Sequence, residues 1–169
     1  MAQTDKEQTK WVQEHGVLKV TGKYRAKEDE HRIAWLAPNS DRQYHSIAAK
    51  IRVHEVKGET YVSLGMSWGE TRWTEISLQM EKDGGDVIVA IEDPKWTEFP
   101  SDFEVQIDQW YVMRFEYKDG QFLYYWNDQL IKTLPPTTPV GDSREQPSVT
   151  FDLGNTQAMT VEIDEIILR

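Results

Sequence analysis

Apolar residues recur at every second position of this chain, in short runs that are separated by turn residues. A clean example lies between Ser46 and His54, where one face carries Ile47, Ala49, Ile51 and Val53 and the other carries Ala48, Lys50, Arg52 and His54. A period of two is the period of a β-strand, because successive side chains point to opposite faces of a sheet. The chain is therefore predicted to fold mainly as strands.

The same pattern returns along most of the sequence. Turn residues separate the runs, and Asp83-Gly84-Gly85-Asp86, Lys118-Asp119-Gly120 and Asn127-Asp128 are predicted hairpin turns. The stretches 94–100 and 135–147 are rich in proline and polar residues and are predicted loops. The strands are expected within 17–20, 32–37, 46–54, 61–68, 73–81, 87–91, 110–117, 122–126, 130–134, 149–153 and 161–168.

Many short strands at hairpin spacing predict an all-β fold, a two-sheet antiparallel sandwich or jelly roll. The 169 residues fit one domain. The expected division is residues 15–169 as a single β-sandwich domain and residues 1–14 as an N-terminal extension or a short helix, with the helix over Lys6–Glu14.

Composition narrows the possible partners. The formal net charge is -10, which disfavours nucleic acid and anionic membrane surfaces as partners but leaves neutral and cationic ones open. The chain contains no cysteine, so thiolate chemistry and cysteine-based metal sites are excluded. No signal peptide or membrane-spanning run is evident, so a soluble protein of unassigned location is expected.

Two segments resemble the concanavalin A-like lectin/glucanase superfamily, which includes laminin-G-like domains. Residues 105–130 are similar to its pattern of a Trp-led strand, an Asp-Gly turn, a second strand and an Asn/Asp turn, and 161–168 are similar to its closing strand. The likeness follows the chain through roughly its last two thirds. It implies a jelly-roll fold but no single function, since this sandwich carries lectins, hydrolases, lyases and interaction domains.

The resemblance also raises the question of catalysis. Retaining glucanases on this fold carry Glu-x-Asp-x-x-Glu on one strand, and the closest match here is Glu162-Ile-Asp164, where Ile167 stands at the second glutamate. We therefore assign no catalytic residue and expect a non-catalytic member. Relatives also place a calcium-binding aspartate on the closing strand, so a structural calcium ion at Asp164 is an alternative to an ordinary strand carboxylate; no other cofactor is expected. Glu14 and Asp29 could supply further oxygens.

The tryptophans are the most suggestive candidates for a ligand surface. Indole rings pack against the C–H faces of sugars, and neighbouring polar groups bind the hydroxyls. We predict a ligand-binding concave face on which Trp73, Trp126, Trp68 and Trp96 stack, and Arg52, His54, Glu75 and Arg114 hydrogen-bond. The competing interpretation of each tryptophan is packing in the core or at a sheet edge.

The favoured hypothesis is a non-catalytic carbohydrate-binding domain whose partner is a polysaccharide or oligosaccharide. One alternative is an accessory domain of a larger protein that contacts other proteins or domains and binds no small ligand. A second is a glycoside hydrolase or polysaccharide lyase with a site that the sequence does not reveal.

Overall fold

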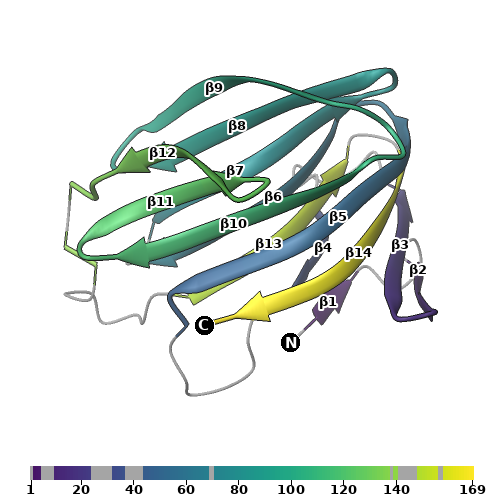
Figure 1. Ribbon diagram of the computed structural model, residues 1–169, viewed down its shortest axis with the longest axis horizontal. Helices are drawn as coiled ribbons and strands as arrows, with labels where there is room; N and C mark the ends of the chain where they lie inside the picture. Colours follow the sequence, from purple (N-terminus) through teal and green to yellow (C-terminus); the bar gives the residue numbers. More distant parts are fainter. Residues whose placement is uncertain are drawn as a thin grey trace.

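The structure is a computed structural model that describes residues 2–4, 10–23, 32–36, 44–68, 71–137, 139–140, 148–155 and 158–169. The regular elements in these ranges are all β-strands, arranged as two antiparallel sheets that face each other (Figure 1), which confirms the predicted sandwich. Nowhere in these ranges is there a helix that is long and apolar enough to cross a membrane.

Sheet A has the strand order β1-β4-β13-β6-β7-β8-β9, and each neighbouring pair is antiparallel. Strands β6 to β9 follow one another as hairpins, whereas β13 inserts between β4 and β6. The strands are β1 (Ala2–Thr4), β4 (Arg32–Leu36), β13 (Ser148–Asn155), β6 (Thr60–Trp68), β7 (Arg72–Glu81), β8 (Gly84–Glu92) and β9 (Trp96–Val105).

Sheet B has the order β12-β11-β10-β5-β14-β3-β2 and is also antiparallel. The closing strand β14 lies between β5 and β3. The last strand of the chain therefore connects the β2–β3 hairpin to the centre of the sheet. The strands are β12 (Gln129–Leu134), β11 (Gln121–Trp126), β10 (Trp110–Lys118), β5 (Ser46–Lys57), β14 (Ala158–Leu168), β3 (Val17–Lys23) and β2 (Lys10–Glu14).

The core lies between the sheets and follows the predicted alternation. The apolar stripe of β5 is buried, and so are Tyr111, Met113 and Phe115 of β10. Aromatic rings fill one region of the core, where Trp68 of sheet A lies 4.8 Å from Phe122 of sheet B, centroid to centroid. Burial of apolar surface, to which these large rings contribute, is the main favourable contribution to the free energy of folding.

Two predicted hairpin turns have the backbone that their residues favour. Asp119 and Gly120 have φ of 52° and 74°, and Asn127 and Asp128 have φ of 46° and 63°. Two successive positive φ values are what a two-residue hairpin requires, and Asn, Asp and Gly adopt them most readily. The turns fix the register of β10, β11 and β12.

Two sequence predictions are wrong in detail. Residues 10–14 form strand β2 and not a helix, because the turn at His15-Gly16, with φ of 53° and 86°, folds them back onto β3; residues 6–9 lie outside the described part. The stretch predicted as a loop at 94–100 includes the start of β9. Pro100 is tolerated there because β9 is an edge strand, and the register shifts beside it.

A chain of buried hydrogen bonds links the two sheets beneath the middle of β7. The Thr74 hydroxyl donates to the carbonyl oxygen of Ala90 at 2.8 Å, so its only proton is used and it accepts from the Tyr124 hydroxyl. Burial raises the pKa of the Tyr124 phenol, the bond to Thr74 lowers it less, and the charge of Glu75 raises it further. The phenol therefore stays protonated and acts as the donor.

We predict that Tyr124→Phe lowers the free energy of unfolding by about 1–3 kcal/mol, because it leaves the fully buried Thr74 oxygen without its donor. Chemical denaturation monitored by tryptophan fluorescence measures this. Tyr125→Phe is the matched control, since Tyr125 is the next residue on β11 and points away from the core; its effect should stay within about 0.5 kcal/mol. Equal losses in the two variants would contradict the proposed hydrogen-bond chain.

Candidate functional site

The outer face of sheet A carries a row of polar and aromatic side chains along β7. Thr74, Ile76, Leu78 and Met80 point into the core, so the alternate residues point outward; these are Trp73, Glu75, Ser77 and Gln79. The strand thus contributes one face to the core and the other to the surface.

Trp73 lies across the neighbouring strand β6. A Cβ atom on Gly65 would come within 2.8 Å of Cζ2 of the Trp73 indole, so the missing side chain at Gly65 makes room for the ring. The indole Nε1 donates to Oε2 of Glu75 at 2.6 Å. Glycine on one strand and a carboxylate on the other therefore fix the plane of the ring.

Trp96 repeats this arrangement two strands away. The tripeptide Trp-Thr-Glu occurs at 73–75 and again at 96–98, and the Trp96 Nε1 donates to Oε1 of Glu98 at 2.8 Å. Glu92 pairs with both Trp73 and Trp96 in the sheet register. Two strand spacings place the two tryptophans about 10 Å apart across the sheet.

The floor beside the tryptophans contains two buried hydroxyl groups. Ser63 of β6 and Ser77 of β7 are direct cross-strand partners, and each is 1% exposed. Neither Oγ has a hydrogen-bond partner among the residues that the structure describes. A buried hydroxyl without a partner costs about 1–3 kcal/mol, so such groups call for an explanation.

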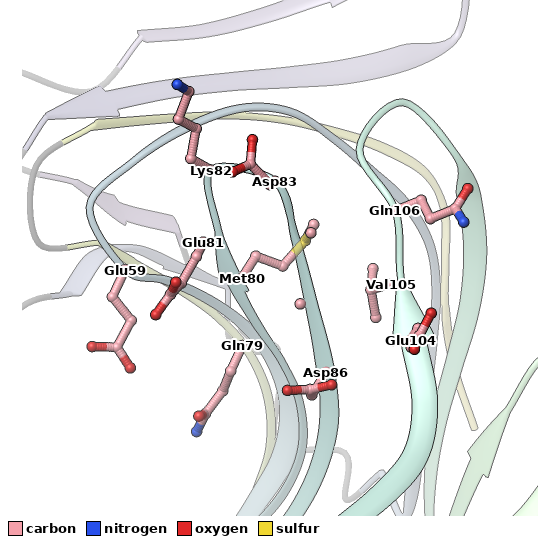
Figure 2. A pocket seen from close by; sticks show the side chains of 12 residues that line it. Glu59, Gln79, Met80, Glu81, Lys82, Asp83, Asp86, Glu104, Val105 and Gln106 are labelled. Atoms are coloured by element: carbon pink, nitrogen blue, oxygen red, sulfur yellow. The ribbon is translucent and has the colours of Figure 1, made fainter.

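These residues line a groove of about 330 Å³. We call it the aromatic groove; its lining is Glu59, Tyr61, Ser63, Trp73, Glu75, Ser77, Gln79 and Trp96. A second hollow of about 650 Å³ lies toward the β7–β8 turn (Figure 2). Glu59 and Gln79 belong to the lining of both spaces.

A partly buried ion pair anchors the ends of the strands that carry the two tryptophans. The Asp93 side chain, 1% exposed, accepts from Nε of Arg72 at 3.1 Å and from the backbone N–H of Thr137 at 2.6 Å. Arg72 directly precedes Trp73, and Asp93 is three residues before Trp96. The pair therefore ties the start of β7 to the β8–β9 turn.

The structure brings together only three of the predicted ligand-binding residues. Trp73, Trp96 and Glu75 meet on the outer face of sheet A. Trp68 and Trp126 are 1% and 3% exposed and pack in the core, so the prediction that they stack on a ligand is wrong. The physical reason is strand alternation. Each tryptophan lies on the same face of its strand as the buried apolar residues before it.

Arg52, His54 and Arg114 lie on the outer face of sheet B, on the other side of the molecule, so they do not share a surface with Trp73. Each is already engaged. The Arg52 guanidinium lies 4.5 Å from the Trp110 ring centre, and that of Arg114 lies 3.5 Å from the Tyr125 ring centre. The expectation of one site containing all these residues is therefore wrong.

Glu162 is the centre of the charge network on sheet B. Its Oε2 lies 3.0 Å from Nε of Arg52 and 2.9 Å from Nε2 of His54, whose Nδ1 lies 2.6 Å from Asp108. Partial burial acts to raise the pKa of Glu162, but the hydrogen bonds and charges of Arg52 and His54 outweigh it and lower that pKa below its usual value.

Asp164, the predicted calcium ligand, pairs with Lys50 at 3.1 Å. Across the described ranges, no group of three or more His, Cys, Asp or Glu side chains is placed to hold a metal ion. Of its predicted companions, Glu14 lies at the end of β2 and Asp29 falls outside those ranges. The calcium site stays a prediction.

The sequence matches no protein-family model and no curated protein. The fold does have relatives among solved structures. The catalytic domain of an endo-1,3-β-glucanase (laminarinase) from Thermotoga petrophila RKU-1 superposes with a TM-score of 0.64 at 14% identity, over 92% of this chain and 77% of that one. The fold is concanavalin A-like.

Other concanavalin A-like neighbours differ in role. The carbohydrate binding module CBM66 from Bacillus subtilis matches with a TM-score of 0.60 at 10% identity, over 94% of this chain and 89% of that one. A laminarinase from Flavobacterium sp. UMI-01 gives 0.63 at 13% identity, over 94% and 80%. At these identities the likeness is one of fold, and the residues of the groove must carry any functional conclusion.

The groove residues that sequence reasoning did not select are Tyr61, Ser63, Ser77, Gln79 and Glu59. Ser77 and Gln79 share the phase of Trp73 on β7, and that alternation could have identified them. The repeated Trp-Thr-Glu could have linked Trp96 to Trp73. Glu59 and Ser63 come from a different strand segment and required the pairing of β6 with β7.

The lowered pKa of Glu162 predicts a specific pH dependence. Because the pKa in the folded state lies below that in the unfolded state, the stabilisation is present above the unfolded pKa and is lost as pH falls through the folded one. Glu162→Gln should cost about 1–3 kcal/mol at neutral pH, with a smaller loss of stability on acidification than in the wild type.

Urea denaturation at a series of pH values from about 7 to about 3 measures this dependence. Arg52→Gln removes the guanidinium in place of the carboxylate, so it should also reduce the loss on acidification. Curves for both variants that parallel the wild type would show that Glu162 does not contribute in this way.

Proposed function

We propose that this protein binds an oligosaccharide in the aromatic groove and does not cleave it. The observation that carries the proposal is the combination of two fixed indole rings, Trp73 and Trp96, with the two unpaired hydroxyls of Ser63 and Ser77 on the floor between polar side chains. Binding sites typically combine aromatic surfaces with a few well-placed polar groups in this way.

The geometry matches the chemistry of a sugar. A pyranose ring offers a C–H face that packs on an indole, and hydroxyls at its edge that need donors and acceptors. Trp96 is 46% exposed although it is large and apolar, which suits a ring that a ligand covers. The Ser63 and Ser77 hydroxyls can donate to and accept from sugar hydroxyls, which would supply their missing partners.

The absence of cleavage is proposed from the outward residues of β7. A retaining glycosidase needs two carboxyl groups about 5–5.5 Å apart. On the groove face of β7, Glu75 is followed by Ser77 and Gln79, a hydroxyl and an amide. Glu98 is two strands away and already accepts the Trp96 N–H. The similar folds of a laminarinase and a carbohydrate binding module support a glycan ligand in general.

Trp73→Ala and Trp96→Ala should each weaken oligosaccharide binding by about tenfold or more, because each removes one stacking surface. Isothermal titration against a panel of soluble oligosaccharides measures this. Trp110→Ala is the matched control, since Trp110 is a half-buried tryptophan on the outer face of sheet B; it should bind like the wild type.

Two results would overturn the proposal. If no oligosaccharide of the panel binds, the groove does not serve glycans. If bound oligosaccharides are cleaved, with new reducing ends that disappear in Glu75→Gln, the protein is a hydrolase.

A further inference from the structure

We infer that the ligand of this groove is an amine-bearing oligosaccharide, a polymer of de-N-acetylated hexosamine whose ammonium groups lie against the carboxylates of sheet A. This inference rests on the proposed function and names the class of sugar that the groove selects.

The charged side chains on the outward face of strands β6 to β9 are all negative. By strand alternation, its outward positions include seven carboxylates, and none of the outward positions described on these four strands is Lys or Arg. An anionic sugar would be repelled by this face, whereas a cationic one would be attracted to it. The seven are Glu75, Glu81, Asp86, Glu92, Glu98, Asp102 and Glu104.

One pair of these carboxylates is expected to destabilise the sheet when no ligand is bound. Asp86 of β8 and Glu104 of β9 are direct cross-strand partners, and both are exposed. Like charges directly opposite each other destabilise a sheet. A ligand cation between them would turn that repulsion into two favourable contacts.

The carboxylates continue from the aromatic groove into the second hollow. Glu59 and Gln79 line both spaces, so the two spaces are adjacent, and the inferred chain of sugars extends from Trp73 toward Asp86 and Glu104. Figure 2 shows Glu59 and Glu81 on one side of this hollow and Asp86 and Glu104 on the other, whereas the ammonium of Lys82 points away from them.

Two further observations favour an amino sugar over other cations. The hydroxyls of Ser63 and Ser77, which have no hydrogen-bond partner among the described residues, belong to the lining of the same groove and suit a ligand with hydroxyl groups. The indoles of Trp73 and Trp96 attract both a pyranose C–H face and an ammonium group. A metal ion is disfavoured, because no set of three carboxylate or His side chains in the described part is arranged to hold one.

The test is isothermal titration of three hexamers with the intact chain at about pH 5.5, where carboxyl groups are ionised. The hexamers are those of glucosamine, N-acetylglucosamine and glucose. The glucosamine hexamer should bind about tenfold more tightly than either uncharged one, and its affinity should fall as salt is raised. Glu104→Gln and Asp86→Asn should remove most of this preference, with little effect on the uncharged hexamers.

Two controls separate this inference from simple attraction to an acidic protein. Glu55→Gln removes one exposed carboxylate from sheet B and should leave the preference unchanged. A lysine hexamer should bind more weakly than the glucosamine hexamer, and Trp73→Ala should weaken only the sugar. Thermal unfolding of each variant verifies that it is folded.

Each possible result decides a different point. Equal or tighter binding of an uncharged hexamer overturns the amino-sugar inference and leaves the proposed function in place. Equal binding of the lysine hexamer, or an unchanged preference in Glu104→Gln and Asp86→Asn, also overturns the inference. Failure of all three sugar hexamers, together with failure of the wider oligosaccharide panel, overturns the proposed function as well.

Discussion

The two-residue period of strand β7 is the constraint on which both the core and the groove depend. One face of the strand supplies buried residues to the sandwich, and its Thr74 hydroxyl connects Ala90 of β8 to Tyr124 of the opposite sheet. The other face supplies Trp73, Glu75 and Ser77. Because the same peptide units hold both rows, packing of the core fixes the backbone from which the groove residues project. The groove therefore has a rigid base.

The two outer faces of the sandwich use their charges differently. On sheet B, cations and carboxylates pair with each other, as Arg52 does with Glu162 and Lys50 with Asp164. On strands β6 to β9 of sheet A, the outward charges are carboxylates, two of which accept indole N–H groups. The central strands of sheet B therefore pair charges of opposite sign, whereas the face with the groove carries an excess of carboxylates. Under the proposed function, the face of sheet A binds the ligand and sheet B supports it.

Alternation along the chain is sufficient to predict the sandwich and the buried stripe of β5, and turn residues predict the β10–β11 and β11–β12 hairpins. The same alternation indicates that Trp68 and Trp126 are buried, because each has the phase of the apolar residues before it on its strand. Strand β9 was harder, since Pro100 and its charged neighbours are typical of a loop and are accepted only at a sheet edge. Local sequence patterns do not show which strands share a sheet. The separation of Arg52 from Trp73 follows from long-range pairing of β5 with β10 and β14.

The central claim is that the groove floor is built for a ligand at some cost to the fold, and Ser77→Ala tests it most directly. Differential scanning calorimetry of this variant, with and without the best-binding oligosaccharide, gives both stability and binding in one experiment. The account predicts an unliganded melting temperature at or above that of the wild type, because an unpaired buried hydroxyl is removed, and a smaller rise on adding the sugar. A lower melting temperature without ligand, or an undiminished rise with it, would contradict the account.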